Sequence, residues 1–143
     1  MGKTIKTIGC DILSLSRFYK ILKSYDEYVL GYLFTVNEFK AAKASCDSKL
    51  FLAICFSGKE AVSKALGHGM SGRSWNEIEI FPGKDGSAKV RINQETRVAE
   101  LNCFWELSWD LKDNFIYVLV NIYSRRLSRM SLIELHILLV AVI

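Results

Sequence analysis

Two acidic residues and a lysine have the types and spacing that phosphate chemistry requires. Asp11 interrupts an apolar stretch near the N-terminus, and Glu60 and Lys64 are four residues apart, so a helix would place them on one face. Mg²⁺ prefers oxygen ligands and is usually held by one or two carboxylates together with phosphate oxygens and water. Asp11 and Glu60 can supply the carboxylates, and Lys64 can neutralise phosphate charge beside them. This combination is typical of phosphoryl transfer, where positioning and charge neutralisation do most of the catalysis.

Each of these residues also has a simpler structural interpretation. Glu60 and Lys64 have the spacing of an ordinary solvated ion pair on a helix surface. Asp11 can be a carboxylate at the end or edge of a strand, where backbone donors satisfy it. The spacing of Glu60 and Lys64 alone therefore does not distinguish a catalytic site from a solvated ion pair. The hypothesis of a site for phosphoryl transfer depends on these two residues occurring together with Asp11.

The elements that must position these residues are predicted from periodicity and helix caps. Thr35 and Glu38 have the spacing of a capping box, and Gly67 is well placed to end a long apolar helix that contains Glu60 and Lys64. The predicted N-terminal elements are a strand over Thr4 to Leu15, a helix over Arg17 to Ser24 capped by Ser16, a helix from Thr35 to about Ala44, and a long helix capped by Asp47 or Ser48.

After Gly72 the spacing of apolar residues changes from a helical period to an alternation with polar residues. Ile78, Ile80, Val90 and Ile92 alternate with polar residues on either side of the turn at 82–86, which predicts a hairpin. A second hairpin is predicted from 103–109 and 115–123. The fold class is therefore α+β, with an antiparallel sheet packed on a long central helix.

Length and composition favour one globular domain. The chain has 143 residues, a formal charge of +4 and one proline, and its four cysteines lack the spacing of a zinc site. We expect reduced thiols and a cytoplasmic protein, since the N-terminus has no apolar signal core. The mild positive charge suits an acidic partner. The sequence shows no platform of basic and aromatic residues of the kind that binds nucleic acid.

The C-terminal part differs from the rest of the chain. We expect a catalytic domain over 1–123, and a basic linker with an apolar extension over 124–143. The apolar run from Leu132 to Ile143 is shorter than the approximately 20 residues that span a bilayer. Packing on the domain or on a neighbouring subunit is the favoured interpretation, and contact with a membrane surface is the alternative.

Three motifs, taken in order, resemble one family. The strand has G-x-D-I from Gly9, the long helix has F-x-x-K-E-A-x-x-K-A-L-G-x-G from Phe56, and W-x-x-I-E-I follows from Trp75. Over about Ile8 to Tyr123 the chain resembles the holo-acyl-carrier-protein synthases of the 4′-phosphopantetheinyl transferase superfamily. These enzymes move phosphopantetheine from coenzyme A to a serine of an apo acyl carrier protein and release adenosine 3′,5′-bisphosphate.

The resemblance implies a role for each matching residue. Asp11 and Glu60 would bind Mg²⁺ against the coenzyme A diphosphate, and Glu60 would help to remove the serine proton, directly or through water. Lys64 would stabilise charge on the diphosphate. The further positions that the resemblance assigns to coenzyme A are Lys59, Gly67 and Gly69 in the helix motif, and Ser108 and Trp109 in a later motif.

The resemblance also implies partners. Arg17 matches the basic position that contacts the acidic helix of the carrier protein, and Lys20 and Lys23 extend that basic surface. An ordinary solvated helix face is the alternative for these residues. Family members of this size are commonly trimers with sites between subunits, so we expect a homo-oligomer with a trimer as the first candidate.

Three positions depart from the family pattern. Cys55 stands where an arginine often binds the 3′-phosphate, Ala88 replaces the proline of G-x-P, and Trp109 replaces the histidine of S-H-[ST]. Tryptophan can stack on adenine but cannot replace histidine at a phosphate. Three interpretations therefore stay open. Lys49, His68 or Arg73 holds the ligand in an active enzyme, or the enzyme has a relaxed cofactor preference, or the chain is a catalytically degenerate relative that acts as a binding or assembly protein.

Overall fold

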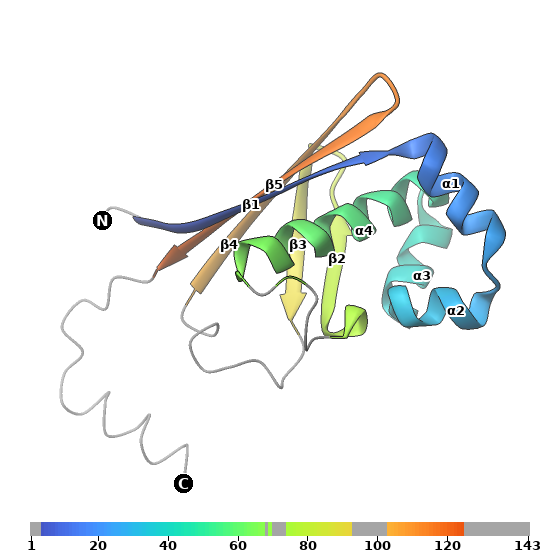
Figure 1. The fold of residues 1–143 in the computed structure, drawn as a ribbon, viewed down its shortest axis with the longest axis horizontal. Coiled ribbons are helices and arrows are strands. Elements are labelled where there is room, and N and C mark those ends of the chain that lie inside the picture. Colours follow the sequence, from blue (N-terminus) through green and yellow to red (C-terminus); the bar gives the residue numbers. More distant parts are fainter. Residues whose placement is uncertain (1–3, 68, 70–73, 93–102, 125–143) are drawn as a thin grey trace, which may run out of the picture.

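A computed structural model describes residues 4–67, 69, 74–92 and 103–124 (Figure 1). In chain order its elements are β1 (Thr4–Ser14), α1 (Leu15–Ser24), α2 (Glu27–Leu33), α3 (Val36–Ala44), α4 (Ser48–Ala65), the short 3₁₀ helix η1 (Trp75–Glu77), β2 (Ile78–Pro82), β3 (Ser87–Ile92), β4 (Cys103–Lys112) and β5 (Phe115–Ser124).

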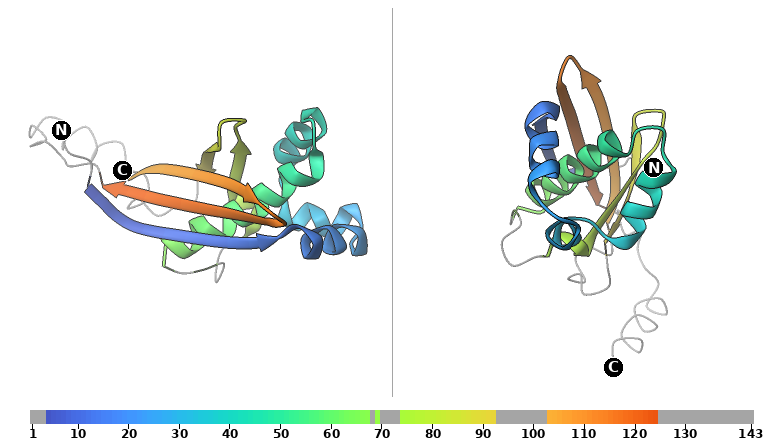
Figure 2. Two further views of the ribbon diagram at one scale, coloured as in Figure 1. Left: turned by 90° about the horizontal axis from the view of Figure 1, so that it is seen from above. Right: turned by 90° about the vertical axis from the view of Figure 1, so that its right-hand side faces the viewer.

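The described strands form one antiparallel sheet in the order β1-β5-β4-β3-β2. The helix α4 crosses one face of this sheet, while α1, α2 and α3 gather beyond one end of it (Figures 1 and 2). The predicted α+β class, with a long helix packed on an antiparallel sheet, is confirmed. Both predicted hairpins are present, and in the second one β4 extends to Lys112, three residues beyond the predicted end.

The sheet register decides which side chains face α4. Asp11 is opposite Val118 and Val118 is opposite Trp109, and directly paired residues of an antiparallel sheet point to the same face. Val118 is buried under α4, so this row of the sheet belongs to the helix-covered face. Asp11 is therefore a carboxylate on the inner face of the sheet, at the margin of the core.

The helix caps agree closely with the sequence prediction. The capping box of Thr35 and Glu38 is present at the start of α3, and the Asp47 carboxylate accepts the Leu50 amide at the start of α4. The predicted Ser16 cap is wrong, because α1 begins at Leu15 with Ser14 as its N-cap. Leu15 donates its amide to the Asn114 carbonyl at 2.9 Å, so the β4–β5 turn sets the start of this helix.

A buried ion pair joins α4 to α3 and β2. The Lys59 ammonium contacts the Glu38 carboxylate at 2.7 Å, and both side chains are fully buried. Lys59 also donates to the carbonyls of Leu33 and Trp75, while Glu38 accepts the amide of Ile80. Burial lowers the pKa of Lys59, an effect that the Glu38 charge opposes. Because a buried charge is costly unless it is paired, these elements must pack together around the pair.

The α4 helix lies against β1 at Gly9. A Cβ atom at this position would overlap the carbonyl oxygen of Ala61 and lie 2.7 Å from the amide nitrogen of Ala65. Two small alanines on α4 and a glycine on β1 thus let the two backbones come into direct contact. This contact places Asp11, two residues further along β1, beside the same helix.

The predicted linker and apolar extension lie almost wholly outside the described residues, since 125–143 are not among them. In the described part of the chain, no helix combines the length and apolar character needed to span a bilayer.

Gly9→Ala tests the close approach of β1 and α4. We expect this substitution to destabilise the fold by about 1–3 kcal/mol, because an added methyl must push backbone away from backbone. Gly31→Ala in α2 is the matched control, since a Cβ there meets nothing within 4 Å and helix propensity favours alanine. Urea unfolding measures both, and a Gly9→Ala protein as stable as the Gly31→Ala protein would contradict this account.

Candidate active site

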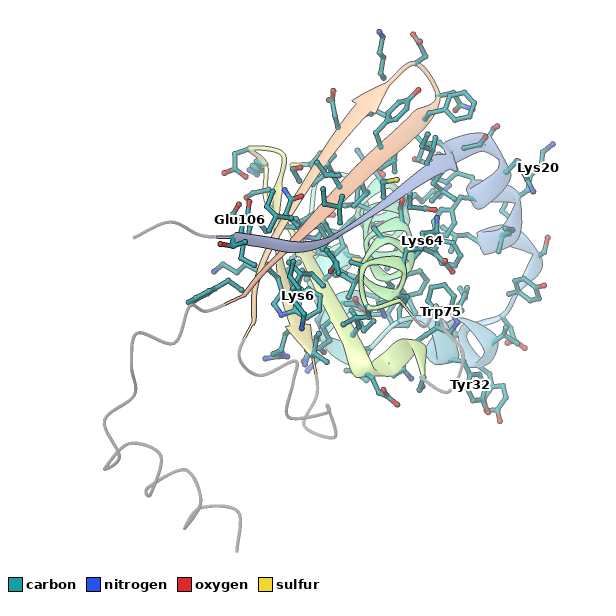
Figure 3. All side chains as sticks on the ribbon, turned by 60° about the vertical axis from the view of Figure 1, so that its left-hand side comes forward. Lys6, Lys20, Tyr32, Lys64, Trp75 and Glu106 are labelled. Atoms are coloured by element: carbon teal, nitrogen blue, oxygen red, sulfur yellow. The ribbon has the colours of Figure 1, made fainter. Side chains whose placement is uncertain are left out.

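Asp11, Ser57 and Lys64 meet where β1 crosses α4. The Lys64 ammonium lies 2.7 Å from Asp11 Oδ1 and also donates to the Cys10 carbonyl at 3.1 Å. Ser57 Oγ donates to the other oxygen, Asp11 Oδ2, at 2.7 Å. Figure 3 shows Lys64 on α4. The Asp11 bond also raises the pKa of Lys64, so the ammonium stays charged.

Glu60 is the second carboxylate of this cluster. It follows Ser57 by three residues and precedes Lys64 by four, so all three side chains leave the same side of α4. Burial raises the pKa of Glu60, and the negative charge of Asp11 raises it further, while Lys64 acts in the opposite direction. Asp11 and Glu60 are therefore close enough to repel each other.

This pair of carboxylates has the donor set that suits Mg²⁺. A divalent cation beside both groups would relieve the repulsion that raises the pKa of Glu60. Within residues 4–67, 69, 74–92 and 103–124, no third His, Cys, Asp or Glu joins them into a larger ligand group. Two carboxylates with an open side are the arrangement that Mg²⁺ uses when phosphate oxygens and water complete its shell.

Lys59 lies away from this cluster, although the resemblance assigned it to coenzyme A. Its ammonium has three hydrogens, and Glu38 and the carbonyls of Leu33 and Trp75 take them. Helical phase explains the difference, because adjacent residues of a helix point about 100° apart. Lys59 therefore enters the core, whereas Glu60 remains half-buried at the surface. In this structure Lys59 is a core residue.

Gly67 and Gly69 follow α4 closely behind Lys64. Both have positive φ, 81° and 56°, and a Cβ at either one would meet nothing within 4 Å. Backbone conformation therefore accounts for these glycines, since positive φ is uncommon for residues with a side chain. The open space beside them is compatible with the approach of a ligand.

Ser108 and Trp109 lie on β4, two strands away from β1. Adjacent strands are about 4.8 Å apart, which places Trp109 about 10 Å from Asp11 across the sheet. The Trp109 indole donates its only N–H to the Ser87 carbonyl at 3.1 Å. Ser108 points to the opposite, outer face of the sheet. These two residues therefore do not join the Asp11 cluster within one chain.

The other altered positions also lie apart from the cluster. Cys55 is fully buried and donates its thiol to the Ile80 carbonyl, and burial holds its pKa well above the usual range. Ala88 is half-buried against the core. Lys49 lies near the start of α4, about 22 Å along the helix from Lys64, and contacts the Tyr19 ring. His68 and Arg73 are outside the described residues.

Arg17, Lys20 and Lys23 are exposed on α1, which directly follows the strand that carries Asp11. Figure 3 shows Lys20 projecting from α1 into solvent. The opposite side of α1 is anchored by Phe18, which is fully buried and lies 5.4 Å from the Phe56 ring of α4. The basic side chains are thus held on a helix that is packed against α4.

Two contacts in this region were not predicted. Ser57 occupies an unspecified position of the helix motif, so nothing in its spacing marked it as a partner of Asp11. Trp75 stacks on Phe56 with the ring centroids 4.8 Å apart, which fixes η1 against α4. The buried position of Lys59 did have a signal, because Cys55 and Val62 lie one turn away on the apolar side of the same helix.

Comparisons with known proteins agree with this geometry. The family model described as the 4′-phosphopantetheinyl transferase superfamily matches residues 7–118. A holo-acyl-carrier-protein synthase of Chlamydia muridarum is 41% identical over 53% of this chain and 62% of its own length. One from Caldanaerobacter subterraneus is 37% identical over 63% of this chain and 70% of its own.

A solved structure shares the fold. The holo-acyl-carrier-protein synthase of Bacillus anthracis, crystallised with coenzyme A (3′,5′-ADP), superposes with a TM-score of 0.67 at 27% identity, over 86% of this chain and 99% of that one. The family-model match over residues 7–118 includes Asp11, Glu60 and Lys64. This chain belongs to the 4′-phosphopantetheinyl transferase superfamily and, within it, to the holo-acyl-carrier-protein synthases.

Proposed function

We propose that this protein transfers 4′-phosphopantetheine from coenzyme A to a serine hydroxyl of an apo acyl carrier protein. The observation that carries the proposal is the meeting of Asp11, Glu60 and Lys64 across β1 and α4, in a chain of this family. The Bacillus anthracis relative was crystallised with coenzyme A, which supports coenzyme A as the donor here.

In this proposal Asp11 and Glu60 hold Mg²⁺, which when bound supplies charge neutralisation at the diphosphate oxygens. The serine oxygen attacks the phosphorus that carries the pantetheine arm, and the bond from that phosphorus to adenosine 3′,5′-bisphosphate breaks. Glu60 accepts the serine proton, directly or through water, as a general base. Lys64 stabilises the negative charge of the departing bisphosphate.

The basic side of α1 is the proposed docking surface for the carrier protein. Arg17, Lys20 and Lys23 are all exposed there, and complementary charge would speed the encounter with an acidic helix. Because α1 continues directly from the strand with Asp11, a carrier bound to this helix can bring its serine toward the cluster. A cytoplasmic location is part of the same proposal and rests on the sequence.

The outer face of the sheet supports a homo-oligomer, with a trimer as the first candidate. Ile8 and Ile12 of β1 are 56% and 62% exposed, and Tyr117 and Leu119 of β5 are also exposed beside them. Large apolar side chains gathered on one open sheet face are typical of a surface that another chain covers. Ser108 lies on this same face, so association would bring it toward a neighbouring copy.

A degenerate binding protein is the second candidate. Cys55 is buried, and the only N–H of the Trp109 indole is already bonded to the Ser87 carbonyl. Neither residue therefore offers a charged group to a phosphate within this chain. If coenzyme A binding depends on such groups, the chain would fold and assemble but would transfer nothing.

Transfer is tested by the intact mass of apo carrier proteins incubated with this protein, coenzyme A and Mg²⁺. We expect a gain of one phosphopantetheine that chelation of the metal prevents, and a rate at least about 100-fold lower for Glu60→Gln, because a general base is lost. Glu27→Gln, an exposed carboxylate on α2, is the control and keeps the wild-type rate. A folded wild-type protein that modifies no carrier and binds no coenzyme A by calorimetry favours the degenerate relative.

Lys64→Met separates the two roles of this lysine. Coenzyme A affinity should fall by about 10- to 100-fold, since a charged contact to phosphate is lost. Mn²⁺ affinity in the absence of coenzyme A should rise, because no ammonium then neutralises Asp11. Mn²⁺ electron paramagnetic resonance measures the second effect, with Lys40→Met on α3 as the control. Unchanged Mn²⁺ affinity in Lys64→Met would show that the metal does not bind at Asp11.

Ile12→Glu tests the outer face of the sheet. A charge at the centre of a buried interface is costly, so this variant should have a lower mass in sedimentation equilibrium than the wild-type oligomer. Val36→Glu on α3 is the matched control, because Val36 is also apolar and is 69% exposed but is not part of the outer face formed by β1 and β5. If both variants keep the wild-type mass, the outer face is not the interface.

A further inference from the structure

The two oxygens of the Asp11 carboxylate have donors of different kinds. Lys64 contacts Oδ1 from a side chain that is 48% exposed, and Ser57 contacts Oδ2 from a fully buried side chain. Breaking the contact of a long exposed side chain costs little free energy, because water replaces the lost partner. Breaking the hydrogen bond of a buried hydroxyl costs more, because no water can replace the lost partner. The Ser57 bond is therefore the permanent one, and the Lys64 bond is the exchangeable one.

The position of Ser57 links Asp11 to the turn of α4 that carries Glu60. Ser57 and Glu60 are three residues apart, so they lie one above the other on the same helix face. The contact between Gly9 and Ala61 holds β1 against this part of the helix, and a short serine side chain then reaches the strand. The hydroxyl thus connects the two carboxylates through one rigid helical turn.

The family resemblance contains nothing about this residue. In the helix motif F-x-x-K-E-A the serine stands at an unspecified position directly after Phe56. Its contact with Asp11, its short distance and its complete burial come from the structure alone.

We propose that Ser57 is a positioning residue for the metal ligand Asp11. By donating to Oδ2 it fixes the rotation of the carboxylate, so that Oδ1 points toward Lys64, where a cation would replace the ammonium. Groups that orient a ligating carboxylate typically contribute a factor of about 10–100 to metal affinity or activity. This inference rests on the proposed function for the presence of the cation.

A merely structural role for Ser57 makes a different prediction. Removing a buried hydroxyl that only supports packing would lower the thermal midpoint and leave cation affinity unchanged. A positioning role lowers cation affinity by more than the loss of stability explains. Because Ser57 is buried and does not touch the reacting atoms, the carrier's KM should stay unchanged while kcat falls.

The experiment measures Mn²⁺ affinity by electron paramagnetic resonance, with thermal unfolding in parallel, for the full-length chain. Ser57→Ala should bind Mn²⁺ at least about tenfold more weakly than wild type, and Ser57→Thr, which keeps the hydroxyl, should recover most of that loss. Ser63→Ala removes an equally buried hydroxyl from the same helix and should retain wild-type Mn²⁺ affinity, which separates positioning from packing.

Two negative outcomes have different meanings. Wild-type Mn²⁺ affinity in a folded Ser57→Ala protein would overturn the role of Ser57 and leave the proposed function intact. A wild-type protein that binds no Mn²⁺, with or without coenzyme A, would overturn the metal assignment and the Ser57 proposal together.

Discussion

The candidate site depends on the direct contact between the backbones of β1 and α4. No side chain separates Gly9 from Ala61, so the strand and the helix lie as close as their main chains allow. Only at this separation can a serine of α4 reach an aspartate of β1, and a lysine about two turns later reach the same carboxylate. A wider spacing would leave Asp11 and Glu60 as two unrelated surface charges.

The buried pair of Lys59 and Glu38 determines how α4 is rotated about its axis. Lys59 must enter the core because its charge needs Glu38 and two backbone carbonyls, and the next residue, Glu60, is then turned out of the core. One ion pair thus assigns opposite environments to two adjacent charged residues. The same pair ties α3 and β2 to α4, so that the helix cannot turn without disrupting the core.

The two faces of the sheet carry different kinds of residues. The inner face carries the core under α4 and, at its margin, Asp11, whereas the outer face exposes Ile8, Ile12 and Leu119. Trp109 belongs to the inner face and Ser108 to the outer one, because neighbouring residues of a strand alternate. Ser108 therefore points away from the Asp11 cluster of its own chain, whereas Trp109 is on the same face as Asp11 but two strands away from it.

The sequence alone determined the fold class, the capping box at Thr35 and the common helix face of Glu60 and Lys64, since these depend on local period and cap chemistry. It did not determine the start of α1, which a hydrogen bond from a distant turn sets, or α2, a short helix without a buried residue. The tertiary structure alone decided that Lys59 is a core residue and that Ser57 holds Asp11. Lys59 meets Glu38 from 21 positions away, and Ser57 meets Asp11 from 46 positions away. The local spacing of residues in the sequence does not show such contacts, because they form only when distant elements pack together.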